Sequence, residues 1–452
     1  MSKYDNYDQF PDVWLSKTPA HWQAHKMKRL FAERSEKGYP NEPLLVASQN
    51  MGVVPKNVYG NRTVEAQKDL HLLKLVHIGD FVISLRSFQG GLEYAYYQGI
   101  ISPAYTILVP HEPMSAPYFR YLAKSKPFIG LLTLCVTGIR EGQNIDYTKL
   151  KNHLLPVPPR DEQDQIVRFL DWKVSSINRL ISVKQKQIAC LNEKFLAAIN
   201  AFVTHGISEN CAYMKTDMDW APVIPSDWSV SRIRNHFEIL KRIAGTEGFD
   251  VFSVTQEGLK VRDINIYEGQ LASDYSGYQF VYPGEFAMNH MDLLTGGIGI
   301  ADHLGVTSPD YRVFRLFDEK RCYAQYYLKV FQICYRRHAF YRFGRGAANV
   351  GRWRLPASAF RNFEIPLPPY EEQVKIVHAI DEEESKTKLL IECLQKQVEL
   401  PKELKNRLVS DAVTGKIDVR GIEIPKYEFV DEDIDNADEN PEQGADEPPE
   451  EE

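Results

Sequence analysis

Between Lys320 and Arg361 the chain carries ten Lys and Arg residues and no Asp or Glu. In the densest part of this stretch, arginines are interleaved with aromatic residues. Guanidinium groups at this density suit the neutralisation of nucleic-acid phosphates, and one or two of them suit paired hydrogen bonds to a guanine edge. The alternative is a solvent-exposed helix face, which would normally mix charges of both signs. We therefore predict a DNA-binding surface with the candidate residues Arg336, Arg337, Arg342, Arg345, Arg352 and Arg354.

Smaller polar groups elsewhere could also contact bases. The segment 140–144 is a weaker counterpart of the arginine stretch, and its amide side chains suit adenine edges. The segments 86–89 and 289–292 follow similar apolar runs but differ in their polar residues, as expected if two related copies read different base sequences. The candidate residues of these segments are Arg86, Ser87, Gln89, Arg140, Gln143, Asn144, Asn289 and His290.

Several segments resemble catalytic motifs but lack the residues that those motifs require. Leu367-Pro368-Pro369-Tyr370 resembles an amino-methyltransferase box, but Leu replaces the Asp or Asn that must accept a hydrogen bond from the target amine. The acids at 310, 318 and 319 imitate a nuclease pattern with too short a gap, and the glycines at 296–299 favour a tight turn over a cofactor loop. No phosphate-binding P-loop or H-E-x-x-H spacing occurs. We therefore expect no catalytic residue, no metal site and no cofactor.

One sequence pattern occurs twice, at an offset of 210 residues. Pro156-Val157-Pro158-Pro159, followed by Glu162 and Gln163, recurs as residues 366–373. Residues 152–207 and 362–417 are identical at 19 of 56 positions. A period this long indicates a duplicated domain rather than a solenoid of short repeats. We expect a pseudo-two-fold molecule with two similar surfaces.

Each proline pair is expected to open a long helix, because proline is favourable in the first turn and the acids after it complement the helix dipole. Apolar residues then recur at spacings of three and four, which is typical of a coiled-coil seam. The expected seam residues are Ile166, Leu170, Ile177, Leu180, Ile188, Leu191 and Phe195, and then Ile376, Ile380, Leu390, Leu394, Val398, Leu404 and Leu408. The pattern predicts helices over 161–205 and 371–414 that pair antiparallel and act as a spacer, with a kink at Pro401. Two separate amphipathic helices are the alternative.

The remaining sequence predicts two similar globular domains. Short apolar runs such as 81–83 and 105–109 are broken by Gly and Pro, and each domain begins with a Pro-x-x-Trp element. We predict an α+β chain in which two mixed α/β domains are joined by two long helices. The expected parts are a first domain over 1–155, a first helix over 156–210, a second domain over 211–365, a second helix over 366–420 and an acidic disordered tail over 421–452.

The composition is ordinary for a soluble protein, with 43% hydrophobic and 25% charged residues. No run of about 18 apolar residues predicts a membrane span, and six scattered cysteines favour a reducing cytoplasm. The net charge of −7 is misleading, because residues 431–452 carry twelve acids and no base. Without them 54 basic residues face 49 acids, and a positively charged body can bind a polyanion.

These features resemble the specificity subunits of type I DNA restriction-modification systems. The resemblance rests on the two P-[VL]-P-P-x-[DE]-E-Q-x-x-I-V segments, on the Val-Thr pair that ends each helix, and on the Pro-x-x-Trp elements, and it covers about residues 12–420. It implies two target-recognition domains that each read one half of a bipartite site in double-stranded DNA. It further implies that the chain is non-catalytic, that two methyltransferase subunits methylate adenine, and that ATP-dependent restriction subunits cleave the DNA.

Two other classes stay open from the residues alone. One is a stand-alone methyltransferase or nuclease with degenerate motifs. The other is a coiled-coil scaffold without DNA contact, against which the charge bias between Lys320 and Arg361 argues.

Overall fold

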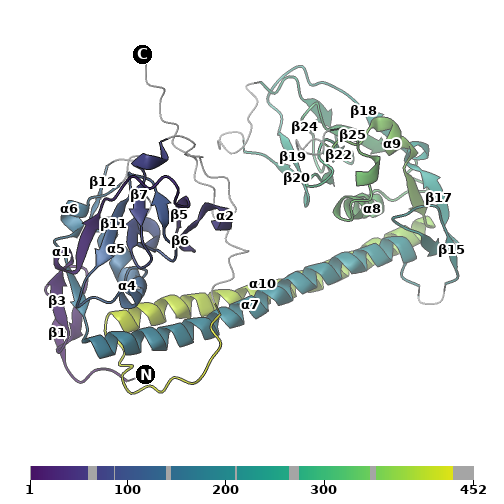
Figure 1. Ribbon diagram of the computed structural model, residues 1–452. Helices are drawn as coiled ribbons and strands as arrows, with labels where there is room; N and C mark the ends of the chain where they lie inside the picture. The colour runs from purple at the N-terminus through teal and green to yellow at the C-terminus, as the bar shows by residue number, and fades with distance from the viewer. Residues whose placement is uncertain are drawn as a thin grey trace, which may run out of the picture. The chain divides into compact units, whose positions relative to one another are not determined.

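The computed structural model describes residues 2–59, 69–85, 87–138, 144–208, 211–263, 274–346 and 353–430 (Figure 1). The chain divides into two compact units. Unit 1 comprises Met1–Lys186 with Leu394–Glu452, and unit 2 comprises Gln187–Cys393. Each unit therefore contains one globular domain together with the first part of one long helix and the last part of the other.

The domain of unit 1 is built around a four-stranded antiparallel sheet. Its order is β4 (Phe31–Arg34), β11 (Thr106–Pro110), β8 (Phe81–Ile83) and β9 (Glu93–Tyr94). The other described strands form pairs: β1 (Tyr7–Gln9) with β2 (Lys17–Pro19), β3 (Gln23–Lys26) with β14 (Leu154–Val157), β5 (Leu45–Ser48) with β6 (Gly52–Pro55), β7 (Lys74–Val76) with β10 (Gly99–Ile101), and β12 (Val136–Thr137) with β13 (Asn144–Ile145). Its short helices are α1 (Met27–Leu30), α2 (Lys56–Tyr59), η1 (Leu70–Leu72), α3 (Ser87–Gly90), α4 (Ala116–Leu122), α5 (Lys126–Leu134) and α6 (Tyr147–Leu150).

The domain of unit 2 repeats this plan. Its four-stranded sheet has the order β18 (Phe237–Leu240), β25 (Arg312–Leu316), β22 (Phe286–Met288) and β23 (Ile298–Ile300). The described strand pairs are β15 (Tyr213–Lys215) with β16 (Val223–Pro225), β17 (Ser229–Arg232) with β26 (Glu364–Leu367), β19 (Phe252–Thr255) with β20 (Gly258–Val261), and β21 (Gln279–Val281) with β24 (Gly305–Thr307). The helical segments are η3 (Ile233–Asn235), α8 (Ala324–Arg336), η4 (Tyr341–Phe343) and α9 (Ala357–Asn362).

The two domains share strand order and register. In the first sheet Leu108 stands opposite Phe81, and in the second Phe314 stands opposite Phe286. All four side chains are buried, and the rings of Phe286 and Phe314 stack with centroids 5.0 Å apart. The predicted α+β chain with two similar mixed domains is confirmed.

The two long helices are α7 (Arg160–His205) and α10 (Tyr370–Val413), within one residue of the predicted bounds. Each begins directly after its proline pair with two acids in the first turn. Beyond their ends stand Gly206 and Gly415, both with φ of +73°, a left-handed conformation that glycine adopts without strain and that commonly terminates helices. Helix α10 does not end at Pro401, which lies within it.

Opposite ends of the two helices pack together in each unit. In unit 1, Ile166 and Leu170 of α7 share a buried cluster with Val409 and Val413 of α10. In unit 2, Val203 of α7 shares a cluster with the first turns of α10. The helices therefore run antiparallel within each unit, as predicted for a coiled coil (Figure 1).

The seam differs from the expected one at several positions of both helices. Leu180, Leu390 and Leu404 were expected in the seam but are 45%, 54% and 56% exposed. Ile181 and Thr387 are buried instead. A straight helix has 3.6 residues per turn, so a stripe that follows a strict heptad drifts around the helix over several turns. The drift leaves large apolar side chains on the outside.

Residues 421–430, expected to belong to a disordered tail, lie in extended form along α7 in unit 1. Ile422 and Ile424 pack against the core of this unit. The Ser175 hydroxyl donates to the carbonyl of Glu428 at 3.1 Å and accepts from the Val430 N–H at 2.7 Å. Burial of these two isoleucines gives the segment a contact that its acidic composition did not predict. The remainder of the expected tail lies outside the described residues.

None of the described helices combines the length and apolar character that crossing a bilayer would require.

Candidate nucleic-acid interface

The predicted arginines of unit 2 follow one another around the end of α8. Arg336 is the last residue of the helix, and Arg337 directly follows it; both are exposed. His338 then adopts a left-handed φ of 57°, which turns the chain towards η4. Arg342 in η4 is exposed, lies over the ring of Phe343 and forms an ion pair with Asp219. A neighbouring carboxylate weakens the attraction of Arg342 for a phosphate, so the other arginines are the better candidates for phosphate contact.

Arg345 and Arg354 lie directly opposite each other on a short antiparallel bridge. Each N–H donates to the other residue's carbonyl, at 2.8 and 3.0 Å, and both side chains are exposed. The Trp353 indole N–H fixes the base of this hairpin by donating to the carbonyl of Tyr341 at 2.6 Å. Like charges directly opposite on paired strands are destabilising. A bound polyanion would relieve that repulsion, so the hairpin stays a candidate for phosphate contact.

Asn289 and His290 form a turn after β22 that lies beside the arginine hairpin. The Asn289 side-chain oxygen accepts from the Met291 N–H at 3.2 Å, and the Tyr335 hydroxyl donates to the Asn289 carbonyl at 2.7 Å. Burial lowers the pKa of His290 to about 4, with a further contribution from the charges of Arg312 and Arg354. His290 is therefore neutral at pH 7. The structure brings this predicted residue and Arg354 together.

A cavity of about 450 Å³ lies between the last part of α7 and the same region of the unit 2 domain. Arg336 lines it with Gln256, Gln332 and His338, and Phe195 and Leu196 of α7 form its apolar side. Gln256, Gln332 and His338 were not predicted, because they come from separate segments that carry no shared motif. Their amide and imidazole groups can donate to or accept from base edges or a protein backbone.

In unit 1 the structure describes only part of the predicted set. Gln89 on α3 and Asn144 on β13 are exposed, and these two elements lie against each other. Ser87 is buried, and its hydroxyl accepts from the Ser84 N–H at 2.8 Å, so it holds the turn before α3. Gly91, with φ of +88°, packs so tightly that an added Cβ would lie 2.2 Å from the carbonyl oxygen of Ala123. Arg86, Arg140, Gln143 and, in unit 2, Arg352 lie outside the described residues.

The Glu-Gln pair that follows each proline pair attaches each long helix to its domain by hydrogen bonds. The Trp22 indole N–H donates to Glu162 at 3.0 Å, and the Trp228 indole N–H donates to Glu372 at 2.9 Å. Gln163 is buried, donates to the carbonyls of Pro113 and Pro158, and accepts from the Ser115 N–H. Gln373 makes the same three contacts with Arg321, Pro368 and Tyr323. These residues position the domains, and their motif is structural rather than catalytic.

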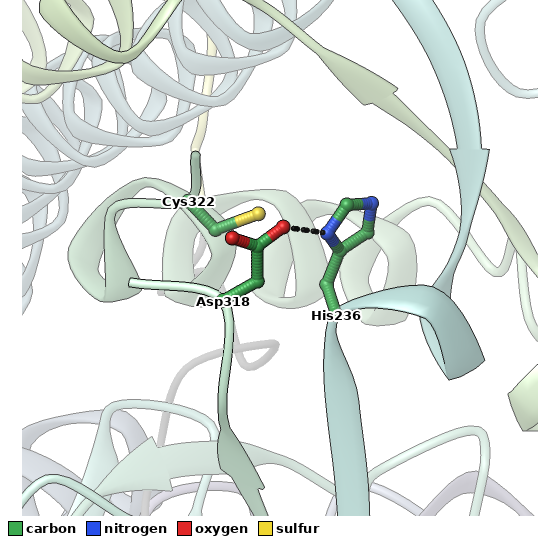
Figure 2. A group of neighbouring side chains, drawn as sticks. All are labelled: His236, Asp318 and Cys322. Carbon is green, nitrogen blue, oxygen red and sulfur yellow. Dashed lines mark hydrogen bonds and ion pairs between the residues drawn. The ribbon is translucent and has the colours of Figure 1, made fainter. Parts of the chain in front are cut away.

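The sequence also predicted no metal site, yet three potential ligands meet in unit 2. His236, Asp318 and Cys322 place their ligand atoms within 4.8 Å of one another. Figure 2 shows the Asp318 carboxylate between the Cys322 thiol and the His236 ring, with the ring Nδ1 and a carboxylate oxygen 2.9 Å apart. Burial raises the pKa of Cys322 to about 11. No local motif indicates this cluster, because His236 lies more than 80 residues before Asp318.

Comparisons with known proteins agree with the resemblance. Residues 264–400 match the family described as type I restriction modification DNA specificity domain. A protein assigned as the specificity subunit of the type I restriction enzyme MjaX of Methanocaldococcus jannaschii is 23% identical over 91% of this chain and 97% of its own length. The MjaVIII specificity subunit of the same organism is 24% identical over 63% of this chain and 66% of its own length.

A solved chain from work on complex assembly and conformational transition of the type I R-M system shares the fold. It covers 88% of this chain and 99% of its own length, with a TM-score of 0.60 and 13% identity. The matched domain, the sequence relatives and the fold agree with the prediction from the repeated motif. We conclude that this chain resembles the specificity subunits of type I restriction-modification systems.

Proposed function

We propose that this chain is the DNA-recognition subunit of a type I restriction-modification complex and reads a bipartite site in double-stranded DNA. One observation carries the proposal: the same fold occurs twice in the chain, and the two copies have different polar residues at equivalent strand ends. Gln89 follows β8 in the first domain, whereas Asn289 and His290 follow β22 in the second. Two copies that present different hydrogen-bonding groups from equivalent strand ends are suited to two different half-sites.

In the second domain the arginine hairpin supplies the phosphate contacts. Arg345 and Arg354 stand opposite each other on the paired backbone, and Arg336 and Arg337 lie a few residues before the hairpin. Arginines that contact phosphates set affinity and its salt dependence, whereas those that reach a guanine edge set specificity. In the first domain Gln89 and Asn144 are the described candidates for base contacts, with Arg86, Arg140 and Gln143 as the remaining predicted ones.

The outer faces of the long helices dock two methyltransferase subunits. In unit 1, Leu180 and Val183 of α7 are 45% and 48% exposed. In unit 2, Leu389 and Leu390 of α10 are 68% and 54% exposed. Large apolar side chains in adjacent exposed positions on a helix suit burial against a partner helix. Leu180 and Leu390 are counterparts at the 210-residue offset, so each unit carries an exposed leucine at the matching place, which supports two docking sites.

The chain itself performs no chemistry in this proposal and binds no catalytic cofactor. Methylation of adenine and ATP-dependent cleavage belong to the partner subunits. The motif Leu367-Pro368-Pro369-Tyr370 supports this assignment, because its prolines end β26 and open α10. A stand-alone enzyme is the competing class.

The test is a methyladenine map of a host genome that expresses a methyltransferase partner with or without this chain. We expect one bipartite motif to be methylated only when both proteins are present. A variant with Arg345→Ala and Arg354→Ala should reduce methylation of the motif, whereas Arg315→Ala should not, because Arg315 is exposed but paired with Glu238 at 2.8 Å. Methylation or cleavage of DNA by the purified chain alone would assign it to the enzyme class instead.

A further inference from the structure

The cluster of His236, Asp318 and Cys322 combines three donor types at one point of unit 2. His236 and Cys322 are 2% and 1% exposed, and the Asp318 side chain is 23% exposed. The ring Nδ1 of His236 faces the Asp318 carboxylate at 2.9 Å (Figure 2). The Nε2 of the same ring lies 2.8 Å from the Ser231 hydroxyl. The thiol of Cys322 points towards the same carboxylate (Figure 2). Three ligand atoms therefore converge from two separate parts of the domain.

The fold does not require these residues. The carbonyl of His236 accepts from the Phe317 N–H at 3.0 Å, and in the first domain the carbonyl of Leu30 accepts from the His111 N–H at 2.7 Å. This shared contact makes Leu30 the counterpart of His236. Leu30 is 1% exposed, so an apolar side chain fills the same place in the same fold.

The other two positions differ in the same way. Glu112 directly follows His111, as Asp318 follows Phe317, and its side chain is 74% exposed where it pairs with Arg160. The carbonyls of Pro113 and Arg321 receive equivalent hydrogen bonds from Gln163 and Gln373, so the next residue, Met114, is the counterpart of Cys322. The first domain thus has a leucine, a solvent-directed glutamate and a methionine where the second has three convergent ligands.

We propose that His236, Asp318 and Cys322 bind a divalent cation of the zinc class in the second domain. Imidazole nitrogen, thiolate and carboxylate are the donors that zinc takes in proteins, at bond lengths of about 2.0 to 2.3 Å. Ligand atoms of a tetrahedral site then lie roughly 3 to 4 Å apart. The 2.9 Å between His236 Nδ1 and the Asp318 carboxylate would lengthen slightly and the wider separations, all within 4.8 Å, would shorten. A water molecule on the half-exposed side of Asp318 completes four ligands.

The surroundings of the histidine fit this role. A metal-binding imidazole normally donates its second N–H to an outer group that fixes the tautomer and the orientation of the ring. Ser231 on β17 stands at that place, next to the Nε2 of His236. Its hydroxyl also accepts from the Asn235 amide at 3.3 Å, so the outer group is itself held. The ligating nitrogen is then Nδ1, the atom that faces Asp318 and Cys322.

The ion would join two segments at one end of the paired strands β18 and β25. His236 immediately precedes β18, whereas Asp318 and Cys322 lie between β25 and α8. The segment that carries Cys322 also supplies the Arg321 carbonyl and the Tyr323 N–H, which bind Gln373 at the start of α10. A cation here would stiffen the place where α8 and the long helix meet. It would stabilise the second domain without taking part in the recognition of bases.

The experiment uses the untagged full-length chain, expressed with added zinc and dialysed against buffer without chelator. Zinc is measured by mass spectrometry, and cobalt(II) is substituted as an optical probe. We expect about one zinc per chain and, with cobalt, a thiolate-to-metal charge-transfer band. Zinc should also raise the midpoint of thermal unfolding of the second domain, and a chelator should reverse the rise.

Three variants locate the ion. Cys322→Ala should abolish the charge-transfer band, and His236→Leu, which copies Leu30, should lose the zinc. Asp318→Asn keeps the size and hydrogen-bonding capacity of the side chain and should bind zinc at least tenfold more weakly. The matched control is Cys334→Ala, because Cys334 is also fully buried in this domain but lies outside the cluster. A wild-type chain without stoichiometric zinc, or a Cys322→Ala chain that keeps it, would overturn the proposal.

Discussion

The hydroxyl of Tyr118 donates a hydrogen bond at 2.8 Å to the carbonyl of Val413, 295 residues further along the chain. Its counterpart Tyr326 donates to the carbonyl of Val203 at 3.1 Å. Val413 and Val203 lie in the last turns of α10 and α7, where backbone carbonyls have no partner within the helix. Each domain therefore holds the start of its own long helix through a glutamine and closes the end of the other helix through a tyrosine.

The substitution Tyr118→Phe should destabilise unit 1. It removes a buried hydrogen bond and leaves the Val413 carbonyl without its donor, which costs about 1–2 kcal/mol. Chemical unfolding followed by far-ultraviolet circular dichroism measures the loss, and Tyr326→Phe should behave similarly in unit 2. The control is Tyr97→Phe, because Tyr97 is 45% exposed. Equal stability of Tyr118→Phe and Tyr97→Phe would show that the buried hydroxyl adds nothing.

The pH dependence of unit 2 should reflect His290, whose pKa is lowered to about 4 in the folded chain. The unfolded chain binds a proton at this residue near pH 6.5, whereas the folded chain does not until about pH 4. Stability is therefore lost as the pH falls from about 6.5 to 4, by at most about 3 kcal/mol and by less because the ring is partly exposed.

The variant His290→Gln tests this effect, because glutamine stays neutral throughout the range. Wild type and variant are compared by thermal unfolding between pH 8 and pH 4. We expect the wild type to lose more stability than the variant on acidification, while their difference stays constant above pH 7. A pH-independent difference would assign the effect of the substitution to packing alone.

Removal of positive charge at the hairpin should weaken DNA binding in proportion to the phosphates contacted. Arg345→Ala or Arg354→Ala should lower affinity for all sequences and reduce the slope of log K against log salt by about one if the residue contacts a phosphate. If it contacts a base, the loss should be roughly 1–3 kcal/mol at one position of the target. Fluorescence anisotropy at several salt concentrations distinguishes the two.

Arg342 offers an internal comparison for the same measurement, since its charge is paired with Asp219. Arg342→Ala should reduce affinity less than Arg354→Ala. Full-strength binding by a variant in which Arg336, Arg337, Arg342 and Arg345 are all replaced by Ala would remove this surface from the DNA interface.

Exposed leucines on the long helices should matter for assembly and not for folding. Leu389→Ser with Leu390→Ser should leave thermal stability within about 0.5 kcal/mol, as expected for exposed positions. The same change should reduce co-purification of a methyltransferase partner from two copies per chain to one. The control Val261→Ser replaces an apolar residue of the same unit that is 52% exposed on β20. Two copies bound by the leucine variant would place the docking surface elsewhere.

The long helices could be predicted to within one residue because local rules determine their ends. Pro158-Pro159 and Pro368-Pro369 punctuate the start, and the acids that follow complement the dipole. The roles of Glu162 and Gln163 could not be predicted in the same way. Their partners Trp22, Pro113 and Ser115 lie about 50 to 140 residues away, and only the folded sheet brings them close.

The candidate site was predictable in its charge but not in its geometry. The density of arginines indicated the surface, yet the pairing of Arg345 with Arg354 depends on the packing of Trp353 against Tyr341. Ser87 was predicted as a base contact on polarity alone, and the structure buries it in a turn with Ser84. Short polar side chains stabilise turns as readily as they bind ligands, and one sequence alone does not distinguish the two roles.

The contacts of the two glutamines bear on how the domains can be exchanged between related genes. Among the described residues, Gln163 and Gln373 bind main-chain atoms of the domains, namely the carbonyls of Pro113 and Arg321 and the N–H groups of Ser115 and Tyr323. Any residue supplies a carbonyl and any residue except proline supplies an N–H, so most substitutions of the domain side chains leave these glutamine contacts intact. The contacts of the Trp22 indole and the Tyr118 hydroxyl, in contrast, depend on the side chain. A recombination event that exchanges a whole domain between related genes would import new base contacts onto an unchanged helical frame. Selection can therefore diversify the target rapidly while the long helices, and any subunits that recognise them, stay the same.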